Sequence, residues 1–372
     1  MPRPALAQHD VIAMFPRANG ESMDVDEQAW PRFLSSVTAQ RLTGLACAAV
    51  EQGALRLSDH HADELIARQR TAMMQTLGLE RRLLDVASAF EANGITYLVL
   101  KGPVLANAFY PDPAWRPFID IDVLVHADHW QHACRVLASI GFRRVLPEPR
   151  PGFDDHYGKA ALHRDGQGFQ LDLHRRLVLG PFGLWMDPER LFAEVDRFQL
   201  GPRYLPRLDD TALLLHACIH AALGANPPLA IPSRDVVEIV RAGDIDWDRF
   251  VDEMGRWRLS VVVDHCARIL RSRFEIVLPD LDDAISRAQV RGSERRALRA
   301  YTTERRRSGG LALATLGAIP GIAPKIGYMW DMLMPSRDFL TVRAAGGQPS
   351  YLRRWSVPLG WVGRSGRERR LR

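Results

Sequence analysis

Residues 118–125 read Phe118-Ile119-Asp120-Ile121-Asp122-Val123-Leu124-Val125, and this stretch decides the fold. Alternate residues of a β-strand project from the same face, so Asp120 and Asp122 are predicted to lie side by side. Ile119, Ile121 and Val123 then pack on the opposite face. Two adjacent carboxylates repel each other unless a cation lies between them, and oxygen ligands suit Mg²⁺. The pattern therefore predicts a metal site on a strand.

A glycine turn precedes this strand. Apolar residues from Ile95 to Leu100 predict a short strand, and a helix is expected over 103–109, directly after Lys101-Gly102. The N-terminus of a helix favours anions, and glycine lets the backbone approach a phosphate closely. Next to a carboxylate pair, such a turn indicates metal-dependent phosphate transfer. The alternative is a solvated strand face, because short acidic motifs also occur by chance.

The composition is that of a globular protein with two or three domains. The chain has 372 residues, of which 47% are hydrophobic and 25% charged, the usual proportions for soluble proteins. Its four cysteines form no CxxC pair, which predicts buried free thiols and argues against a zinc site. The sequence shows no secretion signal, and its longest uncharged run, 308–324, is broken by glycine and proline. We therefore expect a cytoplasmic protein without a transmembrane segment.

The net charge of +5 is unevenly distributed. Residues 341–372 contain eight arginines and one glutamate, a net charge of +7, so the remainder of the chain carries −2. A nearly neutral body argues against a nucleic acid partner, because such binding usually needs a broad basic face. The basic end could still contact acidic lipid, RNA or another partner, and a solvated chain terminus is the alternative.

Periodicity and turn residues divide the chain into four predicted segments. In order, these are an N-terminal helical segment (1–93), a catalytic core (94–205), a C-terminal helical domain (206–310) and a Gly/Pro/Arg-rich basic tail (311–372). Within the core, 159–162 and 169–173 are predicted to form a hairpin, because an Asp-Gly turn joins them. Within the helical domain, one charged helix is expected over 284–307.

The order of these motifs resembles a known superfamily. Lys-Gly, a short helix, an arginine, Asp-Ile-Asp on a strand and a later acidic strand look like the DNA polymerase β-type nucleotidyltransferases. Within that superfamily, Leu-Lys-Gly…Tyr-Pro-Asp-Pro…Arg…Asp-Ile-Asp-Val-Leu-Val is similar to a poorly characterised bacterial nucleotidyltransferase family. The resemblance runs from about Gln69 to Trp361 and is strongest over 97–125. It implies an α+β fold, in which helical regions flank a small mixed sheet.

The resemblance also implies a third metal-site carboxylate on a later strand. Asp172 is the acidic residue in such a context, and an ion pair with a neighbouring arginine is its alternative role. Asp120 and Asp122 would bridge two Mg²⁺ ions, with Mn²⁺ as a substitute, and Asp172 would bind only the catalytic ion. An NTP such as ATP would then be attacked in line at its α-phosphorus, and pyrophosphate would leave.

Cationic and histidine side chains supply the remaining candidates. Lys101, Gly102 and Arg116 are assigned to the nucleotide phosphates, because Pro103 stands where the superfamily usually has serine. For Lys101, a surface lysine at a strand end is an equal alternative.

Histidines four residues apart lie on one face of a helix, as His216 and His220 would. Without a third nearby ligand they do not indicate zinc. We expect His174 and His220 to be candidates for substrate contact and His216 to be a core residue. Asp235 is interpreted as a charge near a helix N-terminus.

These residues favour one function over two others. The first is transfer of a nucleoside monophosphate from an NTP to a hydroxyl or phosphate of a small molecule, peptide or protein. The second is a toxin-like or antitoxin-like nucleotidyltransferase that modifies a protein or tRNA. The third is a catalytically silent nucleotide-binding scaffold, against which the three aspartates argue.

Overall fold

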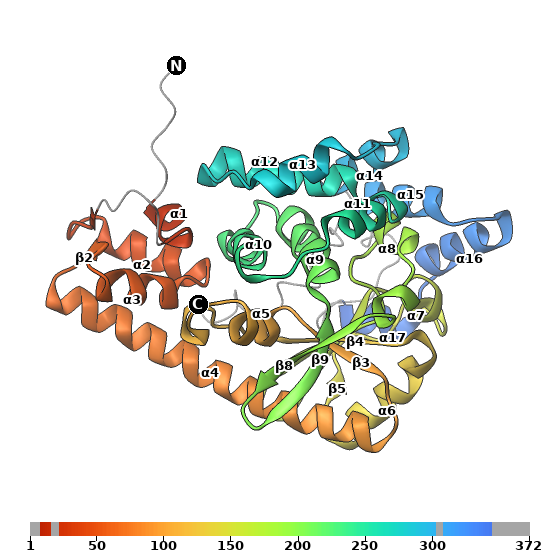
Figure 1. The fold of residues 1–372 in the computed structure, drawn as a ribbon. Coiled ribbons are helices and arrows are strands. Elements are labelled where there is room, and N and C mark those ends of the chain that lie inside the picture. The colour runs from red at the N-terminus through yellow and green to blue at the C-terminus, as the bar shows by residue number, and fades with distance from the viewer. Residues whose placement is uncertain (1–7, 16–21, 303–307, 344–372) are drawn as a thin grey trace.

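The computed structural model describes residues 8–15, 22–302 and 308–343. The protein has the predicted α+β fold, in which helices surround a mixed seven-stranded sheet (Figure 1). The strand order in this sheet is β5-β6-β7-β4-β3-β9-β8. The strands are β3 (Tyr97–Leu100), β4 (Ile121–Val125), β5 (Arg143–Arg144), β6 (Ala160–Arg164), β7 (Gln170–His174), β8 (Val195–Leu200) and β9 (Arg203–Leu208).

Strand β4 lies at the centre of the sheet. It pairs antiparallel with β3 and parallel with β7, and all five of its residues are buried. Burial on both faces explains the β-branched and leucine residues of this strand. The predicted hairpin is confirmed as β6 and β7, which pair antiparallel. The Asp165 side chain closes its turn by accepting hydrogen bonds from the backbone N–H groups of Gln167 and Phe169, both at 2.9 Å.

A second hairpin, β8 with β9, was not predicted from the sequence. The two strands pair antiparallel at one end of the sheet, and β9 pairs parallel with β3, where Val99 is opposite Arg207. Both strands carry several polar residues, and Pro206 lies inside β9. Proline is tolerated on edge strands but argues against a strand when only the sequence is known.

Helix α4 (Asp59–Ala92) links the N-terminal helices to the sheet (Figure 1). It begins at Ser58, whose hydroxyl caps the N–H of His61, and it ends before Gly94, which has a φ of 65°. A serine cap at the start and a glycine just beyond the end are common helix boundary signals. The N-terminal elements are α1 (Gln8–Ala13), β1 (Met23–Asp24), α2 (Trp30–Ala39), α3 (Thr43–Glu51) and β2 (Leu55–Arg56).

Short helices connect the strands of the sheet. They are α5 (Gly102–Ala108), η1 (Pro113–Trp115), η2 (Ala127–His129), α6 (Trp130–Ser139), α7 (Phe153–His156), α8 (Pro181–Trp185) and η3 (Glu189–Phe192).

A group of helices follows the sheet, and α9 is at its centre, packed against α10, α11 and α12. Almost every side chain of α9 is buried, as expected for a helix that is apolar on all sides. These helices are α9 (Asp210–Leu223), α10 (Ala230–Ala242), α11 (Trp247–Arg256), α12 (Ser260–Phe274), α13 (Pro279–Ser286) and α14 (Gly292–Thr302).

Two expectations about this half of the chain are corrected. The single helix expected over 284–307 is two helices, α13 and α14, with a break before Gly292. The predicted basic tail begins with three helices: α15 (Ser308–Ala318), α16 (Ile322–Leu333) and α17 (Arg337–Arg343). Within its described part, residues 311–343, the glycines and prolines lie mostly at or near the helix ends, although the composition suggested an irregular chain. Residues 344–372 lie outside the described residues, and the four-segment division remains a prediction.

The four cysteines are free, as predicted. Cys218 and Cys266 are buried, whereas Cys47 and Cys134 are half-buried. Burial raises the pKa of Cys47 and of Cys134 to about 11, so neither thiol is activated as a nucleophile. Within the ranges that the structure describes, no helix combines the length and the apolar character needed to cross a bilayer.

Candidate active site

Strands β4 and β7 bring two of the predicted carboxylates together. The strands run parallel, and Asp122 is paired directly with Asp172. Side chains at paired positions share one face of a sheet, so both carboxylates project to the same side. Asp122 is buried and Asp172 is half-buried. One ligand atom from each, and one from His174, all lie within 4.8 Å of one another.

Asp120 lies just outside this strand. The predicted strand began at Phe118, but β4 begins only at Ile121, so pairing within the sheet does not fix Asp120. Ile119, which was expected to pack against the core, is 38% exposed. Burial and the charge of Asp122 raise the pKa of Asp120. The carboxylates of Asp120 and Asp122 therefore interact. The regular strand begins one residue after Asp120, however, so only Asp122 has the predicted strand geometry.

The turn after β3 directs a lysine toward the carboxylates. Leu100 is paired with Asp122 across the ladder, and the Lys101 ammonium donates a hydrogen bond to Asp122 Oδ1 at 2.7 Å. Lys101 adopts a φ of 45°, which is uncommon for a residue with a side chain. A Cβ at Gly102 would lie 2.8 Å from Cβ and Cγ of Phe118. Packing against Phe118 therefore requires glycine here, and the role of Gly102 in phosphate binding stays a prediction.

His174 lies beneath Asp122. Its Nε2 is 2.7 Å from Asp122 Oδ1, its Nδ1 is 3.2 Å from the backbone oxygen of Arg176, and its side chain is fully buried. Burial lowers the pKa of His174 to about 4, against the opposing effect of Asp122. A neutral imidazole in this place orients the carboxylate. The His174 side chain has no exposed surface, and its predicted contact with a substrate stays a prediction.

The paired aspartates have opposite pKa shifts. Burial disfavours the charged form of Asp122, but Lys101 and His174 outweigh it and hold the pKa of Asp122 well below its usual range. Burial, together with the charge of Asp122, raises the pKa of Asp172 to about 6. The negative charge of Asp172 is therefore the less compensated of the two, and an added cation would be stabilised there.

Arg116 forms a buried ion pair with Asp235, and its predicted contact with the nucleotide phosphates stays a prediction. Its Nε and Nη2 donate to the two carboxylate oxygens of Asp235 at 2.8 and 2.9 Å, and the guanidinium is buried. The Tyr110 hydroxyl donates to the same carboxylate at 2.8 Å. Asp235 is buried in α10 beyond its first turn, so the interpretation of a helix-terminal charge is corrected. Sequence reasoning missed this pair because its members are 119 residues apart.

Two basic residues that were not singled out from the sequence interact electrostatically with the carboxylates. Arg41, between α2 and α3, is the foremost of the cations that oppose the raised pKa of Asp120. Its φ is 61°, a backbone conformation that usually selects glycine. No local sequence signal identifies Arg41, because a helix end of this kind is usually marked by glycine.

Lys159 lies just before β6. Burial and Lys101 lower its pKa, while Asp122 and Asp172 act in the opposite direction. Its backbone oxygen accepts hydrogen bonds from the N–H groups of Arg175 at 2.7 Å and Arg176 at 3.1 Å. These bonds fix Lys159 at the end of β7. The pairing register of the predicted hairpin could have identified Lys159 as a residue close to the end of β7.

Helix α9 places two histidines near Lys101. Burial and the Lys101 charge lower the pKa of both His216 and His220. His216 is buried, as expected for a core histidine. His220 is half-buried, and its ring packs so closely over Gly224 that a Cβ there would lie 2.7 Å from His220 Cδ2. Contact between His220 and a substrate stays a prediction.

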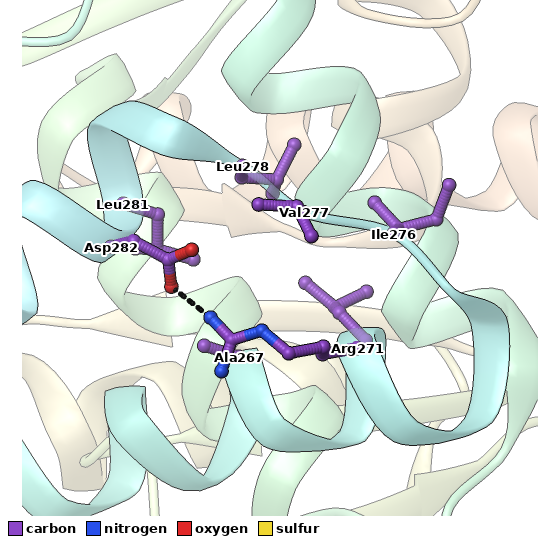
Figure 2. Close-up of a pocket in the computed structure, with 8 residues that line it drawn as sticks. Ala267, Arg271, Ile276, Val277, Leu278, Leu281 and Asp282 are labelled. Atoms are coloured by element: carbon purple, nitrogen blue, oxygen red, sulfur yellow. Dashed lines mark hydrogen bonds and ion pairs between the residues drawn. The ribbon is translucent and has the colours of Figure 1, made fainter.

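Two hollows in the protein lie away from the carboxylates. A cavity of about 460 Å³ between α2 and α4 is lined by residues that include Trp30, Leu34, Glu64 and Arg68. Figure 2 shows a depression where Arg271 of α12 forms a 2.7 Å ion pair with Asp282 of α13. This depression has no room for a water molecule. The candidate site is therefore defined by its charges and pairing rather than by either hollow.

The chain is similar to a known protein family and to solved structures. A family model described as "Uncharacterised nucleotidyltransferase" matches residues 26–275. Among solved structures, an antigenic nucleotidyltransferase-like protein from Paracoccidioides brasiliensis has 16% identity and a TM-score of 0.36, covering 58% of this chain and 94% of that one. Lincosamide antibiotic adenylyltransferase LnuA, bound to lincomycin, has 17% identity and a TM-score of 0.30, covering 43% and 94%. No curated protein matches.

The family match spans β3, β4 and β7 and the helices on both sides of the sheet. It also includes all three candidate aspartates and the lysine and histidine that contact Asp122. Because the match covers well over half of the sequence, the chain belongs to the uncharacterised nucleotidyltransferase family and is a transferase.

Proposed function

We propose that the protein transfers a nucleoside monophosphate from an NTP to a hydroxyl or phosphate group of a small molecule, peptide or protein. The α-phosphorus forms a bond to the acceptor oxygen, and its bond to the leaving pyrophosphate breaks. The observation that carries this proposal is the pairing of Asp122 with Asp172 on one face of the sheet, next to Lys101. Family membership independently supports nucleotidyl transfer.

The donor set fits a hard divalent cation. Asp122 and Asp172 offer carboxylate oxygens close together, and Asp120 adds a third carboxylate beside them. We assign His174 to the support of Asp122 because its Nε2 already contacts that carboxylate. When bound, Mg²⁺ or Mn²⁺ would neutralise phosphate charge and make the acceptor oxygen a better nucleophile.

The chain's own cations complement the triphosphate. Lys101 is positioned by Asp122, and we assign it to the phosphates together with Arg41 and Lys159. These three come from different elements, so a bound NTP would be held from several sides. Arg116 is instead assigned to positioning, because Asp235 already engages its guanidinium. This arrangement places positive charge where negative charge accumulates during phosphoryl transfer.

Removing either paired carboxylate charge should abolish turnover. Asp122→Asn and Asp172→Asn keep the side-chain size, and each should lower the rate at least hundredfold, about 2.7 kcal/mol of transition-state stabilisation. The assay follows label from each α-labelled NTP into a cell extract with Mg²⁺. EDTA should abolish transfer by the wild type, and Asp128→Asn, at a side chain that is 86% exposed, should not. Variants that fold normally and retain full rate would contradict the proposal.

Arg41→Gly separates backbone strain from function. Glycine should relieve the positive φ and stabilise the protein by about 1 kcal/mol. The loss of the guanidinium should raise the KM for NTP about tenfold, since the phosphates lose one cation. Arg258→Gly is the matched control, because Arg258 also has a positive φ, 57°, and its guanidinium lies over Trp185. An unchanged KM in Arg41→Gly would exclude Arg41 from the nucleotide site.

Asp235→Asn tests the positioning role of Arg116. The change leaves a buried guanidinium without its counter-charge and should lower the free energy of unfolding by about 3–5 kcal/mol. Asp252→Asn, in an exposed ion pair with Arg256, should change stability little. Urea unfolding measures both variants. If Asp235→Asn stayed as stable as the wild type while the KM for NTP changed, Arg116 would belong to the nucleotide site after all.

A further inference from the structure

The Asp120 carboxylate must be positioned from outside the sheet. The ladder of β4 with β7 starts at Ile121, and its ladder with β3 starts at Asp122. Phe118 therefore precedes the paired part of the strand, yet this residue is only 1% exposed. A buried backbone N–H or C=O group without a hydrogen-bond partner is costly, so the backbone of Phe118 needs partners from another element. Those partners also decide where Asp120 lies, two residues further along the chain.

A threonine of α4 meets both backbone groups of Phe118. The Phe118 N–H donates a hydrogen bond to Thr76 Oγ1 at 3.3 Å, and the Thr76 hydroxyl is a donor to the Phe118 oxygen at 3.4 Å. Thr76 itself is buried. In an antiparallel sheet, a residue of the neighbouring strand makes both of these contacts. The Thr76 hydroxyl therefore takes the place of a neighbouring strand just before the sheet begins.

The side chain of Phe118 packs against the turn that carries Lys101. A Cβ at Gly102, the next residue, would lie 2.8 Å from Phe118 Cβ, so the two segments are in close contact. The Lys101 ammonium in turn donates to the carboxylate cluster at Asp122. A shift of Phe118 would consequently disturb Asp120 through the backbone and Lys101 through this packing.

We propose that Thr76 is a positioning residue of the carboxylate cluster, and that it acts through Phe118 on Asp120. The inference rests on the proposed function, in which Asp120 is one of the carboxylates that hold divalent cations. A carboxylate that bridges two such ions tolerates little displacement, because the ions demand short and well-defined distances to oxygen. Thr76 supplies no ligand atom and contacts no nucleotide. Its hydroxyl fixes the backbone from which the Asp120 side chain projects.

Thr76→Val removes the hydroxyl and keeps the shape of the side chain. It should weaken Mn²⁺ binding in the presence of a non-hydrolysable NTP analogue, and lower kcat for nucleotidyl transfer, each about tenfold or more. Electron paramagnetic resonance measures the first effect without turnover. Thr71→Val is the matched control on the same helix. Thr71 donates to the backbone oxygen of Ala67 at 3.0 Å, as Thr76 does to that of Ala72 at 3.1 Å, but Thr71 is exposed, so its variant should bind Mn²⁺ normally.

Thr76→Ser separates positioning from stability. Serine keeps the hydroxyl but loses a buried methyl group, so this variant should unfold at lower urea and still bind Mn²⁺ like the wild type. If Thr76 served stability alone, Mn²⁺ affinity would follow the urea midpoint. Folded Thr76→Val that binds Mn²⁺ and turns over like Thr71→Val would overturn the inference, and so would a loss of Mn²⁺ affinity in folded Thr76→Ser. A wild type that neither transfers nucleotide nor binds Mn²⁺ beyond the free analogue would overturn the proposed function and this inference with it.

Discussion

The repulsion between aspartates held close together in the sheet is the constraint on which the rest of the site depends. Parallel pairing of β4 with β7 leaves Asp122 and Asp172 no room to separate. The protein compensates more strongly at Asp122, through its hydrogen bonds with Lys101 and His174, than at Asp172, where the charges of Lys159 and Lys101 do not offset burial and the charge of Asp122. Asp172 keeps a raised pKa, which is the signature of a carboxylate whose charge awaits a partner. A nucleotide carrying divalent cations would supply that partner.

The same constraint explains why helices distant in sequence surround the sheet. Arg41 comes from the N-terminal helices, and His216 and His220 come from α9 beyond the sheet. The buried pair of Arg116 with Asp235 connects the segment before β4 to α10. Helical segments that precede and follow the sheet in the sequence are therefore part of the electrostatic environment of the carboxylates, not merely their support.

The parts of the site that could be predicted are those with a local signal. The alternation around Asp122 and the Asp-Gly turn before Asp172 are visible in a few residues, whereas the fold class was inferred from the resemblance of the motif order to a known superfamily. The pairing of Arg116 with Asp235 could not be predicted, because the two residues are 119 positions apart in the sequence. The hairpin of β8 and β9 was missed because Pro206 and the charged residues of both strands argue against strands when only the sequence is known.

The central claim is that this cluster holds the cations of a bound nucleotide, and Mn²⁺ binding measures it most directly. Electron paramagnetic resonance would count Mn²⁺ ions bound per chain with a non-hydrolysable NTP analogue. The account predicts two magnetically coupled Mn²⁺ ions per chain in the wild type. Asp172→Asn should lose one of them, because the Asp172 carboxylate is assigned to a single ion. Mn²⁺ binding no greater than that of the free analogue, unchanged in Asp122→Asn and Asp172→Asn, would contradict it.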